Sequence, residues 1–321
     1  MAGSNERGRA LEYKIAIEIG NFLREELQLD VISSNSTKQL NFRDKLYFDE
    51  LDEETKNDFS LCVATFVKWF AKQDWLKGAL TVTIDRFGDD KAKSADQTDI
   101  RLGITNENGK LIFKNFSVKN RHDALKHPRL PSLAQQCGIP KESNVDISYR
   151  GHYEAIWESF GKKVNSLNKN IDTFEQLDKI NPKFRVKYLY IPLMENAVDF
   201  LIKHSKKLEC AHSLFQYLVG KTDYIVAKNE SRNVLIKHFS KIDLPASFSV
   251  TYPYTEGEID SQSYFLLEFD NGWKIRVRIH NASGRIFKES GKVFATEKMD
   301  PICINLGKVI PIEKMPKKLT S

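Results

Sequence analysis

Several signals that would assign a function at first sight are missing from this sequence. It has neither the G-x-x-x-x-G-K-[ST] loop of ATP-driven enzymes nor the G-x-G-x-x-G turn of dinucleotide enzymes. No apolar run approaches the about 18 residues of a membrane-spanning helix, and the charged start MAGSNERGRALEY is unlike a signal peptide. We therefore expect no membrane partner and no nucleotide-driven chemistry.

Cysteine is also scarce. The four residues Cys62, Cys137, Cys210 and Cys303 form no C-x-x-C pair, and only Cys210 has a histidine, His212, at close spacing. This disfavours both a zinc site and a disulfide framework. Free thiols are typical of a reducing compartment, so we expect a cytoplasmic protein.

The composition is that of a globular protein. The 321 residues suffice for one large or two ordinary domains, with 41% apolar and 29% charged residues. The 49 Lys and Arg against 43 Asp and Glu leave a formal net charge of +6. Such a mild excess permits a polyanionic partner only if the basic residues are clustered.

Helical periodicity dominates the first two thirds of the chain. We expect helices at residues 7–28, 52–72, 152–167, 194–204 and 208–219. Between them, 80–84 reads as a strand and 98–119 as a hairpin, whereas the three prolines of 126–140 indicate a loop.

Strand patterns take over from about residue 222. Residues 222–228 and 233–239 alternate, and 263–279 reads as a hairpin around Asn271-Gly272. The order predicts an α/β (or α+β) fold with a mixed central sheet, flanking helices and a strand-rich C-terminal part. We draw a soft boundary at about residue 200, giving regions 1–200 and 201–321, and leave open that the two are intertwined.

The hairpin TDIRLGITNENGKLIFKNFSVKNRH, residues 98–122, carries charge at its open end. A three-residue loop with Gly109 in the left-handed conformation is a common solution here and pairs Asn106 with Lys110. Counting outward then places Asp99 opposite Ser117. A two-residue loop would shift the register by one and separate them, so the register is a testable expectation.

Because side chains alternate along a strand, this register brings Asp99, Ser117 and Lys119 to one face. A carboxylate that can hold Mg²⁺ beside a lysine that can orient or deprotonate water suits phosphodiester hydrolysis. The competing interpretation is an exposed cross-strand ion pair of little consequence.

The pattern resembles the PD-(D/E)-x-K nuclease core, which has an acid on one strand and (D/E)-x-K on the next. Ser117 stands here where that pattern has an acid, and no proline precedes Asp99. Several restriction endonucleases of this fold carry Ser-x-Lys and take a second carboxylate from elsewhere. The resemblance therefore implies catalytic roles for Asp99, Ser117 and Lys119, and a missing metal ligand.

Glu12 is our candidate for that second carboxylate. It heads a column with Ala16, Ile19 and Leu23 on the first expected helix, so it starts an apolar stripe. A carboxylate in such a place usually has a metal ion or a base as its partner, and nucleases of this fold often contribute a Glu from this helix. We expect Asp99 and Glu12 to bind Mg²⁺; an acid that merely favours the helix dipole is the competing interpretation.

Basic residues follow the hairpin directly, in KNRHDALKHPR. A basic loop leaving the catalytic strand can reach DNA phosphates or guanine edges. The candidate DNA-binding residues of this loop are Arg121, His122, Lys126, His127 and Arg129. A solvated charged loop is the alternative.

The second hairpin has a similar basic face. In WKIRVRIHN the apolar residues alternate with basic or polar ones, as in a DNA-contacting ribbon. The candidates here are Arg276, Arg278, His280 and Asn281. An ordinary solvent face of an amphipathic strand would look the same.

Five segments together resemble the HaeIII-type type II restriction endonucleases. They are NERGRALEY, TDIRL, SVKNRHDALKHPRLPSL, LFQYLVGKTDYI and FDNGWKIRVRIHNAS, in this order along most of the chain. The resemblance implies a bacterial enzyme of the restriction-endonuclease-like fold that needs Mg²⁺. It also implies cleavage of double-stranded DNA at a short palindrome, with GGCC as the site associated with the group.

Two other functions stay open on the sequence. One is a nucleic-acid-binding protein without catalysis, and the other is a repair-type nuclease of the same fold with little sequence specificity. A palindromic site would favour a two-fold homodimer, although some enzymes of this kind act as monomers.

Overall fold

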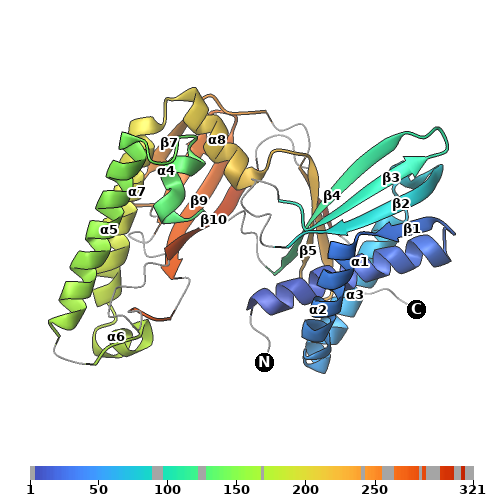
Figure 1. Ribbon diagram of the computed structural model, residues 1–321, viewed down its shortest axis with the longest axis horizontal. Coiled ribbons are helices and arrows are strands. Elements are labelled where there is room, and N and C mark those ends of the chain that lie inside the picture. Colours follow the sequence, from blue (N-terminus) through green and yellow to red (C-terminus); the bar gives the residue numbers. More distant parts are fainter. Residues whose placement is uncertain are drawn as a thin grey trace. The chain divides into compact units, whose positions relative to one another are not determined.

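The computed structural model describes residues 4–88, 97–121, 128–167, 170–239, 243–254, 264–281, 284–286, 297–306 and 312–314. The chain divides into two compact units (Figure 1). Unit 1 comprises residues 1–123, 220–242 and 309–321, and unit 2 comprises residues 124–219 and 243–308. Each unit has its own sheet and helices.

Unit 1 is built on a seven-stranded mixed sheet in the order β1-β2-β3-β4-β5-β6-β11. The β1/β2 and β4/β5 pairs are parallel and the other pairs are antiparallel. Its strands are β1 (Asp30–Ser33), β2 (Ala79–Arg86), β3 (Ile100–Asn106), β4 (Leu111–Asn120), β5 (Tyr224–Asn229), β6 (Val234–Phe239) and β11 (Ile312–Lys314).

Three helices cover this sheet: α1 (Ser4–Glu25), α2 (Asn35–Asp49) and α3 (Glu53–Phe70). The apolar stripes of α1 and α3 meet the inward side chains of β2–β6 in one core. Phe66 and Phe70 of α3 both contact Phe116 of β4. Burial of these aromatic rings anchors α3 to the hairpin strand that carries the candidate site.

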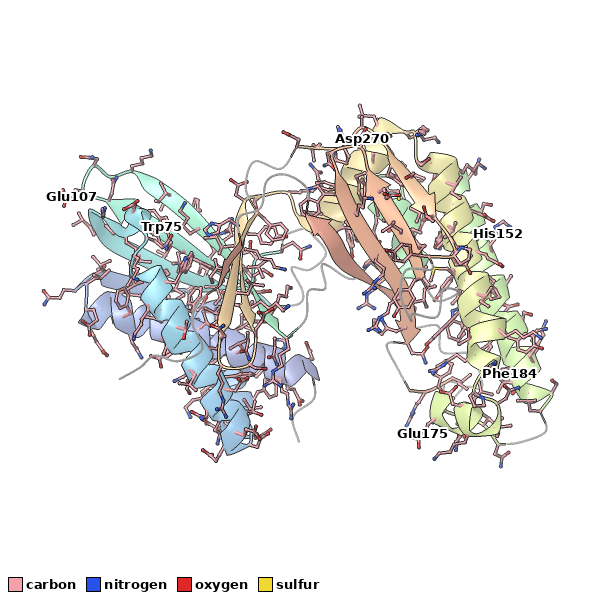
Figure 2. The ribbon with its side chains drawn as sticks, turned by 180° about the vertical axis from the view of Figure 1, so that it is seen from behind. Trp75, Glu107, His152, Glu175, Phe184 and Asp270 are labelled. Atoms are coloured by element: carbon pink, nitrogen blue, oxygen red, sulfur yellow. The ribbon has the colours of Figure 1, made fainter. Side chains whose placement is uncertain are left out.

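The antiparallel hairpin β3–β4 has the register that the sequence predicted. Ile100 pairs with Phe116, and the pairing continues to Thr105 and Leu111. Gly109 has φ +70° in the loop, where Glu107 also lies (Figure 2). The three-residue loop is therefore confirmed, and Ile100, Leu102, Phe116 and Val118 are all buried in the core.

Unit 2 combines helices with a four-stranded antiparallel sheet in the order β10-β9-β8-β7. The helices are α4 (Leu133–Gln136), α5 (Asn144–Asn165), α6 (Phe174–Ile180), α7 (Ile191–His204) and α8 (Leu208–Val219). The strands are β7 (Phe248–Thr251), β8 (Tyr264–Phe269), β9 (Trp273–Asn281) and β10 (Glu297–Leu306). Short turns of 3-10 helix at Asp74–Leu76 and Leu130–Ser132, and of π-helix at Val186–Tyr190, complete the described elements.

One face of the unit 2 sheet is apolar. Phe215 of α8 packs edge-on against Phe269 of β8 and Trp273 of β9. Along β9, Ile275, Val277 and Ile279 are buried on this side. The intervening polar side chains therefore belong to the opposite face of the sheet.

The observed α+β architecture agrees with the predicted fold class, but the linear division near residue 200 does not match the two units. Strands β4 and β5 are parallel neighbours, and a parallel pair needs a long crossover connection. Residues 124–219 form that connection and belong to unit 2. Unit 1 therefore takes β5 and β6 from beyond residue 200.

Some elements were missed or misplaced by sequence patterns. Helix α2 has weak amphipathic contrast, since its buried residues are the polar Thr37 and Asp44. Helix α5 begins eight residues before the expected start, because Ser143 caps it through the amide of Asp146. The expected loop at 126–140 contains α4 and a 3-10 turn. No helix in the described ranges is long and apolar enough to cross a membrane.

Candidate active site

Asp99 lies immediately before β3 and is fixed by the neighbouring strand β4. Its Oδ2 accepts hydrogen bonds from the Ser117 hydroxyl at 3.1 Å and from the Val118 amide at 2.6 Å. Its own amide donates to the carbonyl of Phe116 at 2.8 Å. Ser117 is fully buried, and its hydroxyl holds the Asp99 carboxylate in place. Ser117 thus has a positioning contact at the sequence position where the related pattern has an acid.

The charge state of Asp99 is set by opposing influences. Burial raises the pKa of Asp99 above its ordinary range. The Lys119 ammonium, the amide of Val118, the hydroxyl of Ser117 and the Arg86 guanidinium each act to lower it. Lys119 thus interacts electrostatically with Asp99, as the hairpin register predicted.

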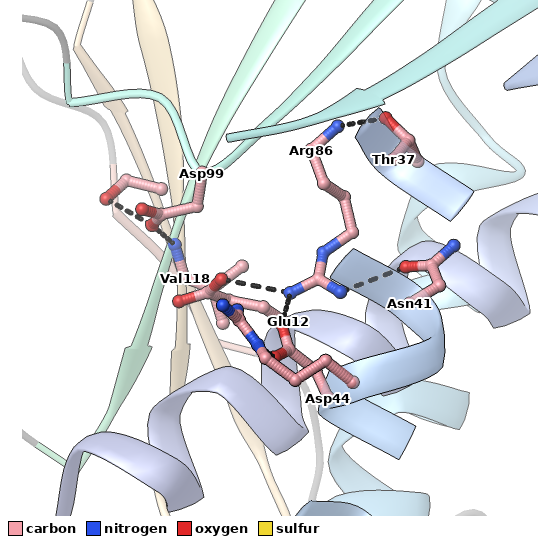
Figure 3. A network of polar contacts seen from close by, with 9 residues as sticks. Glu12, Thr37, Asn41, Asp44, Arg86, Asp99 and Val118 are labelled. Atoms are coloured by element: carbon pink, nitrogen blue, oxygen red, sulfur yellow. Dashed lines mark hydrogen bonds and ion pairs between the residues drawn. The ribbon is translucent and has the colours of Figure 1, made fainter. Parts of the chain in front are cut away.

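Glu12 of α1 faces the same place from the helical layer (Figure 3). The pKa of Glu12 is raised to about 8, first by burial and then by the Asp99 carboxylate, whereas Arg86 and Arg9 act in the opposite sense. Below it in the column, Ala16, Ile19 and Leu23 are buried. The structure therefore brings together the two carboxyl groups that the sequence singled out, and each disfavours ionisation of the other.

A buried arginine that sequence analysis did not identify lies beside Glu12. The Arg86 Nη2 donates to Glu12 Oε2 at 3.2 Å and to Asp44 Oδ2 at 2.8 Å, and its Nη1 donates to Asn41 Oδ1 at 2.9 Å (Figure 3). A sequence signal existed, since Arg86 follows Val82 and Ile84 at the inward positions of β2.

The donor set suits a hard divalent cation, which prefers carboxylate oxygens. Two half-buried carboxyl groups with raised pKa values would share one cation more easily than they would both ionise without it. Among the described residues, no group of three or more His, Cys, Asp and Glu side chains is placed to hold a metal ion. Glu12 and Asp99 stay the candidate ligand pair because their carboxyl groups converge (Figure 3).

A second lysine stands next to Lys119 in the sheet. Lys228 of β5 is its register partner in the parallel β4/β5 pair. Lys228 is buried and forms an ion pair with Glu230 at 3.2 Å. Sequence analysis missed it because β5 lies 109 positions further along the chain, and parallel pairing carries no local signal.

Arg121, expected to contact DNA, has an intramolecular partner. Its Nη2 donates to Asp58 Oδ2 at 3.0 Å, and its amide donates to the carbonyl of Asn229. Asn229 is buried and donates to the same oxygen of Asp58. The side chain of Arg121 is still 59% exposed, so this anchored guanidinium keeps an accessible edge.

The other candidate DNA contacts belong to unit 2. Arg276, Arg278 and His280 are half-buried on the polar face of β9, with Arg276 5.3 Å from the ring centre of Tyr264. The carboxamide oxygen of Asn281 accepts a hydrogen bond from Tyr190 at 2.6 Å. Arg129 is exposed. His122, Lys126 and His127 lie outside the described residues.

Comparisons with known proteins place the sequence in a family. Residues 8–293 match the family described as HaeIII restriction endonuclease. The type II restriction enzyme HaeIII of Haemophilus aegyptius is 22% identical over 313 residues, covering 87% of this chain and 90% of the relative. The crystal structure of restriction endonuclease MspI with its cognate DNA aligns with a TM-score of 0.28 and 12% identity, over 90% of this chain and 97% of that one.

The α+β fold and a family match over most of the chain define a type II restriction endonuclease, an enzyme that cleaves DNA at specific sites. The chain belongs to the HaeIII restriction endonuclease family.

Proposed function

We propose that this protein hydrolyses phosphodiester bonds of double-stranded DNA with Mg²⁺ held by Glu12 and Asp99. The observation that carries the proposal is the convergence of these two carboxyl groups, from helix α1 and the start of β3 (Figure 3). Burial raises both pKa values, and the Asp99 carboxylate adds to the rise at Glu12. A divalent cation would relieve the repulsion between the two carboxylates. Hard divalent cations are also the ions that serve phosphoryl chemistry.

The residues around this pair have separable roles in the proposed reaction. A bound Mg²⁺ would supply charge stabilisation at the phosphate and favour ionisation of the attacking water. As an ammonium, Lys119 orients that water and adds positive charge beside the phosphate, whereas the neutral amine would accept the proton of the water. Ser117 and the Val118 amide keep the Asp99 carboxylate pointed at the site.

DNA binding is assigned to basic side chains in both units. In unit 1 we assign Arg121 and His122, and at the start of unit 2 we assign Lys126 and His127. In unit 2 we assign Arg129 and the polar face of β9, formed by Arg276, Arg278, His280 and Asn281. The exposure of Arg121 and Arg129 and the alternation along β9 support these assignments.

For the target we propose GGCC, read as a palindrome. A two-fold symmetric site favours a homodimer, because each subunit can then contact one half-site in the same way. The similarity to a type II restriction enzyme supports cleavage at a specific site, and GGCC is the site that the resemblance of the five sequence segments implies.

The test is digestion of a sequenced plasmid with and without Mg²⁺, followed by mapping of the fragment ends. Discrete fragments ending at GGCC would support the proposal, and discrete fragments ending elsewhere would replace only the target site. A smear would favour a low-specificity nuclease. Intact plasmid with folded, DNA-binding protein under all metal conditions would favour a binding protein without catalysis.

Substitution of the lysine separates chemistry from binding. Lys119→Ala should lower kcat by about 10²- to 10⁴-fold, the range for a general acid–base residue, with little change in DNA affinity. Lys110→Ala is the matched control, since Lys110 is exposed in the loop at the other end of the same hairpin and should cleave normally. Equal activity of the two variants would refute the role of Lys119.

A further inference from the structure

Arg86 is buried far more deeply than its charge alone would allow. Its side chain is 1% exposed at the end of β2, and burying a charge is costly unless it is paired and hydrogen-bonded. All the side-chain partners given above come from helices, at least 42 positions away along the chain. The position of the Arg86 guanidinium is therefore fixed by contacts with residues far away in the sequence.

One face of helix α2 contacts this arginine. Thr37, Asn41 and Asp44 follow one another at i, i+4 and i+7, which places them on one side of the helix. Thr37 Oγ1 accepts from the Arg86 backbone amide at 2.9 Å, whereas Asn41 and Asp44 accept from its guanidinium. The buried residues of α2 are thus polar groups that fix Arg86 at both its backbone and its tip.

Asp44 already has enough positive charge around it without Glu12. It is fully buried, and its Oδ1 accepts from Arg43 Nε at 2.7 Å while its Oδ2 accepts from Arg86. Both oxygens of Asp44 are therefore paired without any contribution from Glu12. The additional bond from Arg86 Nη2 to Glu12 is longer, at 3.2 Å, and comes from a donor that Asp44 shares.

This shared bond orients Glu12 without neutralising it fully. The rest of its column on α1 is apolar, so an unsupported Glu12 side chain could rotate toward solvent. The contact uses Oε2, and in the described part of the chain Glu12 Oε1 has no contact with Arg86. One oxygen is held while the other stays available for a cation.

We propose that Arg86 is a positioning residue that holds the Glu12 carboxylate in its metal-binding orientation, and that Asp44 and helix α2 serve to place Arg86. This inference rests on the proposed function of Glu12 as a metal ligand. It extends the site from the hairpin and α1 to a supporting layer formed by α2.

The direct measurement is the affinity of the intact protein for Mn²⁺, determined from the electron paramagnetic resonance signal of the free ion. Arg86→Met removes the donor, and Arg86→Met with Asp44→Asn also removes the buried charge that loses its Arg86 partner. Loss of groups that orient a metal ligand typically costs about 10- to 100-fold in metal affinity. We expect that loss in both variants, and a partial recovery in Arg86→Lys, which keeps the charge but not the fork.

A double-mutant cycle shows whether Arg86 acts through Glu12. In a Glu12→Gln background, Arg86→Met should cause little further loss of Mn²⁺ affinity, since the oriented group is already gone. Additive losses would overturn the inference. Arg150→Met is the matched control, because Arg150 pairs with the fully buried Asp146 in unit 2 at 3.1 Å and should change only stability.

A second readout is the Mg²⁺ concentration that gives half-maximal plasmid cleavage. It should rise about 10- to 100-fold in the Arg86→Met/Asp44→Asn variant, with kcat largely recovered at saturating Mg²⁺. Wild-type Mn²⁺ affinity in folded Arg86 variants would overturn the inference and leave the nuclease proposal intact. A wild-type protein that binds no Mn²⁺ and cuts no DNA would overturn the nuclease proposal and, with it, the inference.

Discussion

At the scale of single residues, the candidate site depends on how a few carboxyl groups are buried. Asp99 is held by Ser117 and Val118, and Glu12 is held by Arg86. Both carboxyl groups have raised pKa values, first because burial disfavours their charged forms. Sites that bind a charged ligand often contain ionisable groups whose charged form is disfavoured until the ligand is bound.

The raised pKa of Glu12 predicts how stability depends on pH without metal. The folded protein keeps the Glu12 proton up to about pH 8, whereas the unfolded chain releases it near the ordinary value of 4.5. Stability should therefore fall as pH rises from 4.5 toward 8, by an amount of the order of a few kcal/mol.

Glu12→Gln isolates this effect from other titrating groups. The free energy of unfolding of the variant minus that of the wild type, from urea titrations in EDTA, should grow between pH 5 and pH 8. Mg²⁺ should narrow the difference at pH 8, because the proposed ion holds the ionised carboxylate. A difference that stays constant with pH would contradict the assignment of the raised pKa to Glu12.

At the scale of elements, the hairpin β3–β4 places Asp99, Ser117 and Lys119 through its register. The loop glycine sets that register, because Gly109 has φ +70°, a backbone conformation that other residues rarely adopt. The alternation of buried and polar residues then decides which side chains face the core. Local chemistry at the tip of the hairpin thus positions groups at its opposite end.

Gly109→Ala tests whether the loop needs a residue with positive φ at this position, because the added methyl group meets no other atom. No atom lies within 4 Å of a Cβ added at Gly109, so the cost should be the strained φ alone, about 1 kcal/mol of stability. Gly151→Ala is the matched control: this α5 residue also has open space around it but no positive φ, and the change should stabilise by about 0.5–1 kcal/mol. A Gly109→Ala variant that is as stable as the wild type in thermal unfolding, or more stable, would refute the loop assignment.

At the scale of the whole molecule, the candidate site residues are divided between two units. The candidate catalytic groups belong to unit 1, and the polar face of β9 belongs to unit 2. The chain leaves unit 1 after β4 and returns at β5, so neither unit is a continuous segment. Chemistry and part of DNA recognition are therefore expected to respond to different substitutions.

Arg276→Gln with Arg278→Gln tests the contribution of the β9 face. If both side chains contact phosphates, DNA affinity should fall and the slope of log K against log salt should decrease by about two, or about one per contact. Lys203→Gln, an exposed α7 position, should leave the slope unchanged. An unchanged slope in the double variant would remove β9 from the DNA interface.

The sequence by itself determined the features that depend on near neighbours along the chain. The hairpin register follows from one turn, the alternation along β9 follows from the period of a strand, and the column below Glu12 follows from the period of a helix. For the same reason the helix at 208–219 and the turn at Asn271-Gly272 could be located from sequence.

Only the tertiary structure decided which distant residues meet. Arg86 joins Glu12 across 74 positions and Asp44 across 42, and Arg121 joins Asp58 across 63. The parallel β4/β5 pair likewise puts Lys228 beside Lys119 and divides the chain into interleaved units. Such pairings arise from packing and from the need to compensate buried charge, and neither leaves a periodic pattern in the sequence.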